Sequence, residues 1–294
     1  MAAARRLPGA PVQGILLDRF NHHLFQPLLY QVATVSLAVP SVAAPLRQIM
    51  RHQRHLTVLL GEVTGVGLAA RRVQLAHGEL GYDFLIVATG ATHASFGHAE
   101  WERFALGLRT PDDAFLIRRP VLLAFEHAER GTDPARPPAW LNSVVVGGGA
   151  TGVELAGTLI EVARHTLSRE FRGNDLRRAS VQLIEAGLRL LPAFDPTLSN
   201  KALQKLEHLG VEVRIGTAVT AIDAYCVALG KQRLPARTVL WAAGVAASPW
   251  GRLLGAPLDR AVGVQVRPDL SLPGHSEAFI IGDLASITQT SGKP

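Results

Sequence analysis

The apolar residues of this chain fall into short runs that end at a glycine or a carboxylate, as buried strands of α/β proteins do. Val144 to Val146 form a β-branched run followed by glycine, and Val181 to Ile184 form a run followed by Glu185. A helical segment, Pro196 to Leu209, connects the second run to a third, Val211 to Ile215. This alternation of strands and helices predicts a doubly wound parallel sheet.

Runs of the same kind lie on both sides of that segment. Gly14 to Asp18 predicts a short strand ending at a carboxylate, and Tyr82 to Ala88 predicts another. A third run, Ala278 to Ile281, leads into Gly282 and Asp283. Ligands of open α/β sheets bind at the carboxyl ends of strands, so each of these ends is a candidate binding position.

The strongest motif follows the first run. Gly147, Gly149 and Gly152 have the GxGxxG spacing between a predicted strand and a predicted helix. The first glycine permits a tight turn, the second lets a pyrophosphate approach the backbone, and the third permits close packing of helix and strand. Glu185 can accept hydrogen bonds from adenosine ribose hydroxyls and would repel a 2′-phosphate. The motif predicts an NADH site rather than an NADPH site, the alternative being a glycine turn without a nucleotide.

Composition narrows the functional classes. The 294 residues suit two domains, and 48% hydrophobic with 18% charged residues describe a globular protein. The net charge is +6, but no compact basic run with interleaved aromatic residues is present, so we expect no nucleic-acid partner. Cys226 is the single cysteine, which argues against a redox cysteine pair. His22 and His23 are expected to be structural, and no metal site is predicted.

One uncharged stretch, Leu24 to Leu46, has the length of a membrane span. Pro27, Pro40 and Pro45 interrupt it, and proline breaks a continuous helix. We therefore expect buried, irregular structure lining a site.

Together these motifs resemble the flavoproteins with two dinucleotide-binding domains, and more narrowly the type II, non-proton-pumping NADH:quinone oxidoreductases. The most specific match is the segment from Asn21 to Ala33, NHHLFQPLLYQVA. Further matches are LGEV at 60–63, ATG at 88–90, FGH at 96–98, GGGATGVELAG at 147–157, LPAFD at 191–195 and GD at 282–283.

The resemblance implies two Rossmann-like domains, with the NADH domain inserted into the FAD domain. The FAD-binding domain would comprise residues 1–110 and 262–294, and the NADH-binding domain residues 111–261. Residues implied to bind FAD are Asp18, Ala88, Thr89, Gly90, Gly282 and Asp283, with Gln26, Pro27 and Tyr30 beside the flavin ring. Residues implied to bind NADH are Gly147, Gly149, Gly152, Glu185, Ala243 and Gly244. Glu154, on the nicotinamide side, is implied to be catalytic together with Gln26, Pro27 and Tyr30.

The implied reaction is hydride transfer from NADH to FAD, followed by reduction of a quinone. The implied protein is cytoplasmic and peripheral on the inner face of the cell membrane, and a homodimer is a further expectation. A non-catalytic NADH-binding remnant and a sulfide:quinone or disulfide reductase are the alternatives. The family's first strand, its flavin-phosphate glycine turn and its region after Gly-Asp are missing from these residues. We therefore expect a fragment that holds FAD poorly.

Overall fold

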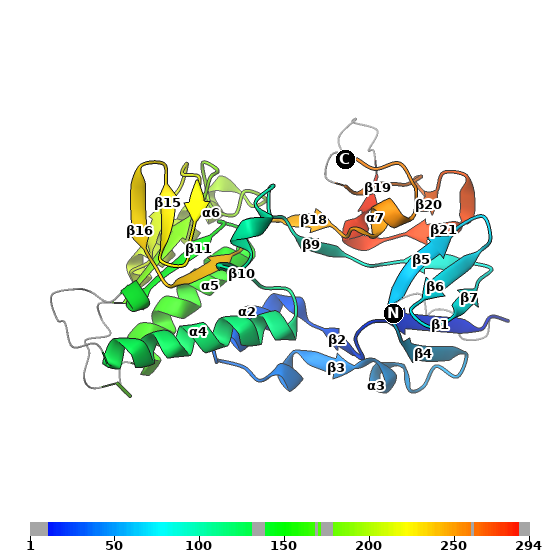
Figure 1. Ribbon diagram of the computed structural model, residues 1–294, viewed down its shortest axis with the longest axis horizontal. Coiled ribbons are helices and arrows are strands. Elements are labelled where there is room, and N and C mark those ends of the chain that lie inside the picture. Colours follow the sequence, from blue (N-terminus) through cyan, green and yellow to red (C-terminus); the bar gives the residue numbers. More distant parts are fainter. Residues whose placement is uncertain (1–10, 131–138, 168–169, 172–178, 260–261, 288–294) are drawn as a thin grey trace. The chain divides into compact units, whose positions relative to one another are not determined.

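A computed structural model describes residues 11–130, 139–167, 170–171, 179–259 and 262–287. The chain divides into two compact units (Figure 1). Unit 1 consists of Met1–Leu24, Ala43–His93 and Val245–Pro294, and unit 2 consists of Phe25–Val42 and Ala94–Gly244. Unit 2 is thus inserted into the sequence of unit 1. The expected α/β fold with one unit inserted into the other is confirmed.

Unit 2 is built on a parallel sheet with the strand order β10-β17-β11-β12-β13. The strands are β10 (Ala105–Gly107), β11 (Asn142–Val146), β12 (Ser180–Ile184), β13 (Glu212–Arg214) and β17 (Thr238–Trp241). The chain runs outward from β11 to β12 and β13 and returns to pair β17 with the other edge of β11. The junction of β11 and β17 is therefore the switch point, where doubly wound sheets bind their ligands.

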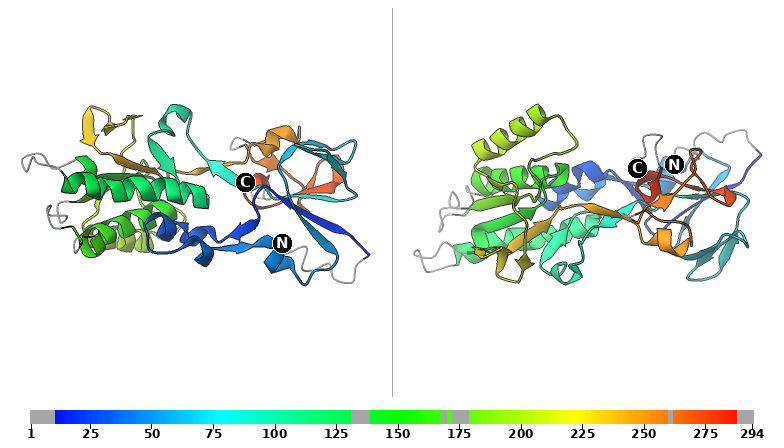
Figure 2. Two further views of the ribbon diagram at one scale, coloured as in Figure 1. Left: turned by 60° about the horizontal axis from the view of Figure 1, so that its bottom comes forward. Right: turned by 90° about the horizontal axis from the view of Figure 1, so that it is seen from above.

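Helices of unit 2 pack on this sheet, as Figures 1 and 2 show. They are α4 (Pro111–Glu129), α5 (Ala150–Glu161) and α6 (Pro196–Leu209). Helix α4 contacts β10 and β17, α5 contacts β11 and β12, and α6 contacts β13. A π-helical turn, Val162–Thr166, continues α5, and the short α2 (Leu29–Ala33) packs against α4 and α5.

A small antiparallel sheet packs against the parallel sheet as well. It consists of β14 (Ala221–Ile222), β15 (Cys226–Leu229) and β16 (Gln232–Pro235). Val144, Val146 and Val239 of the parallel sheet share one hydrophobic cluster with Ile222 and Val227 of the small sheet. Because successive side chains of a strand point to opposite faces, Val145, which has no exposed surface, belongs to the other face. This explains why β11 is apolar at consecutive positions.

Among its described residues, unit 1 contains three separate parallel pairings, of which the shortest joins β19 (Val264–Gln265) and β22 (Ala285–Ser286). Strand β1 (Gly14–Asp18) pairs with β4 (Leu56–Leu60), and β8 (Leu85–Val87) pairs with β21 (His275–Ile280), which also pairs antiparallel with β20 (Ser271–Leu272). The remaining strands are β2 (His22–Leu24), β3 (Ala43–Pro45), β5 (Val63–Gly67), β6 (Arg72–Leu75), β7 (Glu79–Gly81), β9 (Ala91–His93) and β18 (Val245–Ala247). Two short helices, α3 (Leu46–Met50) and α7 (Trp250–Leu253), complete the unit.

The uncharged stretch is more regular than expected. It contains two 3-10 turns, Gln26–Leu28 and Val39–Ser41, the helix α2 and the strand β3. Leu29, Val32 and Ala33 of α2 are buried. Within the described residues, no helix has both the length and the apolar character needed to cross a membrane.

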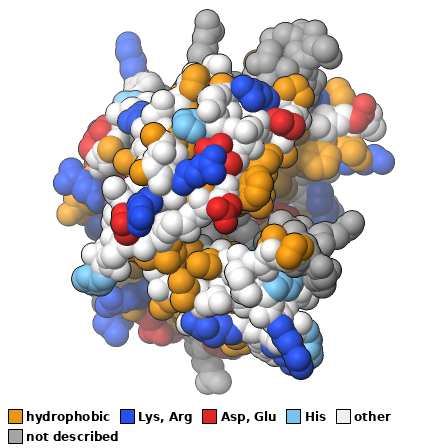
Figure 3. Space-filling model, turned by 90° about the vertical axis from the view of Figure 1, so that its right-hand side faces the viewer, with side chains coloured by type: hydrophobic (Ala, Val, Ile, Leu, Met, Phe, Trp, Pro, Cys, Tyr) orange, Lys and Arg blue, Asp and Glu red, His pale blue; other side chains and the backbone are white. Residues whose placement is uncertain are grey.

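Charged and hydrophobic side chains are mixed on the face of the molecule in Figure 3. Basic, acidic and apolar groups are interspersed there, so that the net positive charge of the sequence is not gathered in one basic patch on this face.

The N-terminus of α4 is closed by a capping box. Thr110 Oγ1 accepts the Asp113 N–H at 3.1 Å, and Asp113 Oδ2 accepts the Thr110 N–H at 2.8 Å. Pro111 occupies the first turn, where its missing N–H leaves no helical hydrogen bond unmade. The capping threonine, the first-turn proline and the early acidic residues therefore stabilise the start of α4 at Pro111.

We expect Thr110→Ala to lower the free energy of unfolding by about 1 kcal/mol, because it leaves the Asp113 N–H without its side-chain acceptor. Denaturant unfolding followed by far-ultraviolet circular dichroism measures the change. Thr110→Ser keeps the hydroxyl and is the matched control. Equal stability of the alanine variant and the unmodified chain would contradict the capping role.

Candidate functional site

The glycine turn lies at the carboxyl end of β11. Gly147 has φ +112°, and a Cβ there would overlap the carbonyl group of Ala242, which follows β17. A Cβ on Gly152 would overlap the carbonyl oxygen of Gly147. The two glycines therefore permit the close packing of α5 against the ends of β11 and β17.

Gly149 differs from its two neighbours in the motif. It is the N-cap of α5 in extended conformation, and a Cβ built on it would have no neighbour within 4 Å. No side chain caps this helix, and its first turn contains no acidic residue. The N–H groups of that turn and the positive end of the helix dipole are thus available to an anion such as a pyrophosphate.

Glu185 lies beside the turn, directly after β12. Its Oε2 accepts the N–H of Gly148 at 2.5 Å, and its Oε1 accepts the N–H of Gly187 at 2.5 Å. The carboxylate is half-buried and fixed by two backbone donors. Since a carboxylate has about four acceptor positions, it can still accept hydrogen bonds from a ribose diol. The structure therefore brings together the glycine turn and the acidic residue that the sequence identified.

Ala243 and Gly244 lie on the opposite side of the turn. The N–H of Ala242 donates to the carbonyl of Val146 at 2.7 Å, which continues the pairing of β11 and β17 beyond the strands. Gly244 has φ +152°, and its carbonyl accepts the N–H of Ala94 at 3.2 Å. The glycine turn, Glu185 and this segment thus lie together at the carboxyl ends of β11, β12 and β17.

Glu154 lies in the second turn of α5, near the same edge. The residue as a whole is exposed, yet desolvation of its carboxyl raises the pKa above the ordinary value. A carboxylate that is partly removed from water without a compensating cation is unfavourable for folding. This makes Glu154 a candidate for a functional group.

The residues implied to bind FAD lie in unit 1. Asp18 ends β1 and accepts the N–H of Phe20 at 2.8 Å. Ala88, Thr89 and Gly90 follow β8, and Gly282 and Asp283 follow the parallel neighbour β21. Gly282 has φ +72° and open space where a Cβ would lie. Asp18 therefore belongs to the β1–β4 sheet, whereas Gly90 and Asp283 follow strands of the β20–β21–β8 sheet, so the two parts of the implied FAD site lie in separate sheets. This separation agrees with the expectation that these residues alone hold FAD poorly.

Gln26, Pro27 and Tyr30 belong to unit 2. The Nε2 of Gln26 donates to the carbonyl of Arg109 at 3.4 Å, and the hydroxyl of Tyr30 accepts from Gln31 Nε2 at 3.0 Å. Gln26 and Pro27 are exposed, and Tyr30 is half-buried. These three residues lie on the segment whose helix packs against α4.

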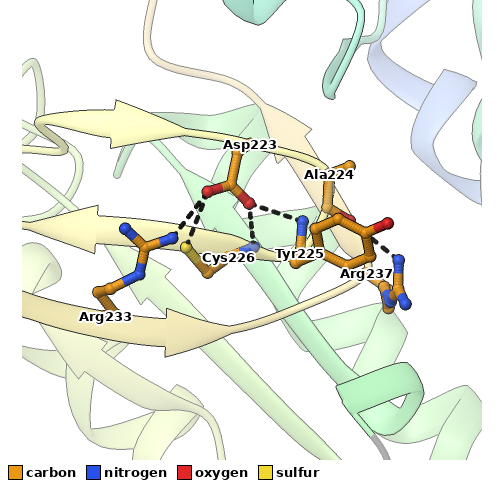
Figure 4. A network of polar contacts seen from close by, with 6 residues as sticks. All are labelled: Asp223, Ala224, Tyr225, Cys226, Arg233 and Arg237. Atoms are coloured by element: carbon orange, nitrogen blue, oxygen red, sulfur yellow. Dashed lines mark hydrogen bonds and ion pairs between the residues drawn. The ribbon is translucent and has the colours of Figure 1, made fainter.

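Cys226 belongs to a polar network on the small sheet (Figure 4). Its Sγ donates to Asp223 Oδ2 at 3.3 Å, and the same carboxylate accepts from the Arg233 guanidinium at 2.8 Å. Burial, followed by the hydrogen bond to Asp223, raises the pKa of the thiol. A buried, protonated thiol is a poor nucleophile, so the network is structural. Within the described residues, no group of three His, Cys, Asp or Glu side chains could hold a metal ion.

The sequence did not single out the aromatic residues next to Gly244. The ring centroids of Phe96 and Trp241 are 6.4 Å apart, and Trp101 packs edge-on against Trp241 at 5.8 Å. The Nε1–H of Trp241 donates to the carbonyl of Ala94 at 2.8 Å. Only the FGH motif at 96–98 was a signal for this region, and it carried no chemical prediction.

Comparison with known proteins identifies the family and relatives of this chain. Residues 1–293 match the family described as pyridine nucleotide-disulphide oxidoreductase. Two type II NADH:quinone oxidoreductases of Mycobacterium tuberculosis are 42% and 41% identical to this chain over 99% of its length. The chain spans 65% of the length of each of these relatives.

A solved structure has the same fold. The NDH2 of Plasmodium falciparum in complex with NADH superposes with a TM-score of 0.85 at 23% identity, over 94% of this chain and 60% of that protein. A match that covers nearly every residue, together with the glycine turn and its neighbouring strands, shows that this chain belongs to the pyridine nucleotide-disulphide oxidoreductase family.

Proposed function

We propose that this chain is the nucleotide-binding part of a type II NADH:quinone oxidoreductase. The observation that carries the proposal is the open N-terminus of α5 at Gly149, with Glu185 beside it on the next strand. Similarity to the two Mycobacterium tuberculosis enzymes supports the reaction type. When bound, NADH supplies a hydride to FAD, which then passes the electrons to a quinone.

In this proposal the residues of unit 2 bind NADH. The N–H groups at the start of α5 hold the pyrophosphate, and Glu185 holds the adenosine ribose and disfavours a 2′-phosphate. Ala243 and Gly244 hold the nicotinamide half, and Glu154 approaches it from α5. Removal of water from this edge would strengthen each of these polar contacts.

The residues of unit 1 are assigned to FAD: Asp18, Ala88, Thr89, Gly90, Gly282 and Asp283. Gln26, Pro27 and Tyr30 are assigned to the flavin ring. The expected bounds, 1–110 with 262–294 for the FAD-binding domain and 111–261 for the NADH-binding domain, remain a proposal about cofactor binding. The compact units have other bounds, since residues 25–42 and 94–110 group with unit 2 and residues 245–261 with unit 1. Quinone as the electron acceptor, peripheral attachment to the inner face of the cell membrane and a homodimer belong to the same proposal.

Purification of the chain tests the proposal. We expect a Kd for NADH below that for NADPH, because Glu185 accepts ribose hydroxyls and repels the additional phosphate. Bound flavin that NADH bleaches and a quinone reoxidises would support the full reaction. A colourless protein that binds NADH would be the non-catalytic remnant, and failure to bind NADH would overturn the proposal. Cys226, buried and the single cysteine of these residues, argues against a dithiol reductase.

We expect Gly149→Val to weaken NADH binding at least about tenfold, the equivalent of about 1.4 kcal/mol, by filling the space of the pyrophosphate. Its φ of −72° is normal for valine, so the fold should remain intact. Isothermal titration calorimetry measures the affinity, and circular dichroism monitors the fold. Gly81→Val is the matched control, since Gly81 also has open space around it and lies in unit 1. Unchanged NADH affinity in Gly149→Val would show that the turn binds no nucleotide.

Glu154 provides a pH-dependent prediction. Its raised pKa means that the folded protein favours the protonated carboxyl. The contribution of Glu154 to the free energy of unfolding is therefore greatest below the ordinary pKa of a glutamate, and it is lost as the pH rises through the raised pKa of the folded state. We therefore expect Glu154→Gln to have a higher Tm than the unmodified chain at neutral pH and an equal Tm in acid. Thermal unfolding across this pH range measures the difference. A difference that does not vary with pH would contradict the assigned cause.

A further inference from the structure

Segment 94–98 of unit 2 lies against the carboxyl end of β17. The N–H of Ala94 donates to the carbonyl of Gly244 at 3.2 Å, and the carbonyl of Ala94 accepts from Trp241 Nε1 at 2.8 Å. The N–H of His98 donates to the carbonyl of Ser95 at 2.9 Å, which closes a tight turn. The turn is therefore fixed through Ala94, at its N-terminal end, to the strand that ends beside the glycine turn.

Phe96, at the tip of this turn, has an unfavourable backbone conformation and an unfavourably exposed side chain. Its φ is +49°, a region that residues with a Cβ seldom adopt, and 67% of its surface is exposed. The ring lies over Gly244, because a Cβ on that glycine would be 3.3 Å from Phe96 Cζ. A strained backbone that presents an apolar ring to solvent is typical of a binding site.

The position of the ring follows from the sheet order. Glu185 on β12 lies on one side of the glycine turn, and Gly244 after β17 lies on the other. A dinucleotide that places its pyrophosphate on the turn and its adenosine ribose at Glu185 extends its second half toward β17. Phe96 lies over the backbone at the end of that path.

We propose that Phe96 is a further binding residue, whose ring covers the nicotinamide half of NADH at Gly244. This inference rests on the proposed function and adds a residue to its site. Ring-on-ring contact explains both the exposure of the side chain and the adoption of a left-handed conformation at a residue other than glycine. Trp241, which itself packs edge-on against Trp101, lies next to the Phe96 ring.

The test compares two ligands in the unmodified chain and in Phe96→Gly. ADP-ribose contains every part of NADH except the nicotinamide, so it does not reach Phe96. We expect Phe96→Gly to raise the Kd of NADH about fivefold and to leave the Kd of ADP-ribose unchanged, as measured by isothermal titration calorimetry. Glycine accepts positive φ, so the variant should unfold at a Tm no lower than that of the unmodified chain.

Two further variants complete the design. Phe96→Tyr retains the ring and should keep the NADH affinity of the unmodified chain. Phe115→Ala removes an exposed ring from α4 and should change neither Kd. An unchanged NADH affinity in Phe96→Gly, or equal weakening of both ligands, overturns the role of Phe96. Failure of the unmodified chain to bind either ligand would instead overturn the proposed function and this inference with it.

Discussion

The site of unit 2 depends on the close approach of three backbone segments at the ends of β11 and β17. The hydrogen bond from Ala242 to Val146 holds the two strands together up to their last residues. The chain must then turn at Gly147 against the Ala242 carbonyl and begin α5 with Gly152 against the Gly147 carbonyl. A side chain at either glycine would separate helix and strands, and the N–H groups of the first turn of α5 would no longer lie at the edge of the sheet.

The covering of the parallel sheet explains why polar chemistry is confined to its ends. Val144 and Val146 belong to the cluster shared with the small antiparallel sheet, whereas Val145 belongs to the opposite face. A polar side chain within β11 would lose its hydration on either face. Glu185 lies just beyond β12, where the N–H groups of Gly148 and Gly187 donate hydrogen bonds to its carboxyl oxygens.

Elements with explicit local signals could be predicted from the sequence. Helix α6 has the expected bounds, Pro196–Leu209, because Asp195 caps its start and Gly210, with φ +92°, ends it. The glycine turn and Glu185 were found for the same reason. The short strands of the small sheet are local hairpins, and the sequence from Thr220 to Leu240 predicts them. The packing of that sheet on β11, the grouping of residues 25–42 with unit 2 and the position of Phe96 depend instead on contacts between residues far apart in the chain, which no local pattern encodes.

The proposed discrimination between nucleotides comes from local groups at the site rather than from the net charge of the chain. The cation nearest in sequence to Glu185, Arg189, is engaged by its own loop, since its guanidinium donates to the carbonyls of Pro192 at 2.6 Å and Phe194 at 3.0 Å. Attraction for a pyrophosphate at the turn would then come from the N-terminus of α5, and the nearby carboxylate of Glu185 would repel additional phosphate on the ribose. The N-terminus of α5 attracts the pyrophosphate that both dinucleotides share, whereas Glu185 repels the phosphate that only NADPH has on its adenosine ribose. Together they can discriminate between NADH and NADPH. The proposed preference for NADH therefore follows from backbone geometry and one carboxylate. It opposes the effect of the net positive charge of the chain, which by itself would attract the more highly charged NADPH more strongly.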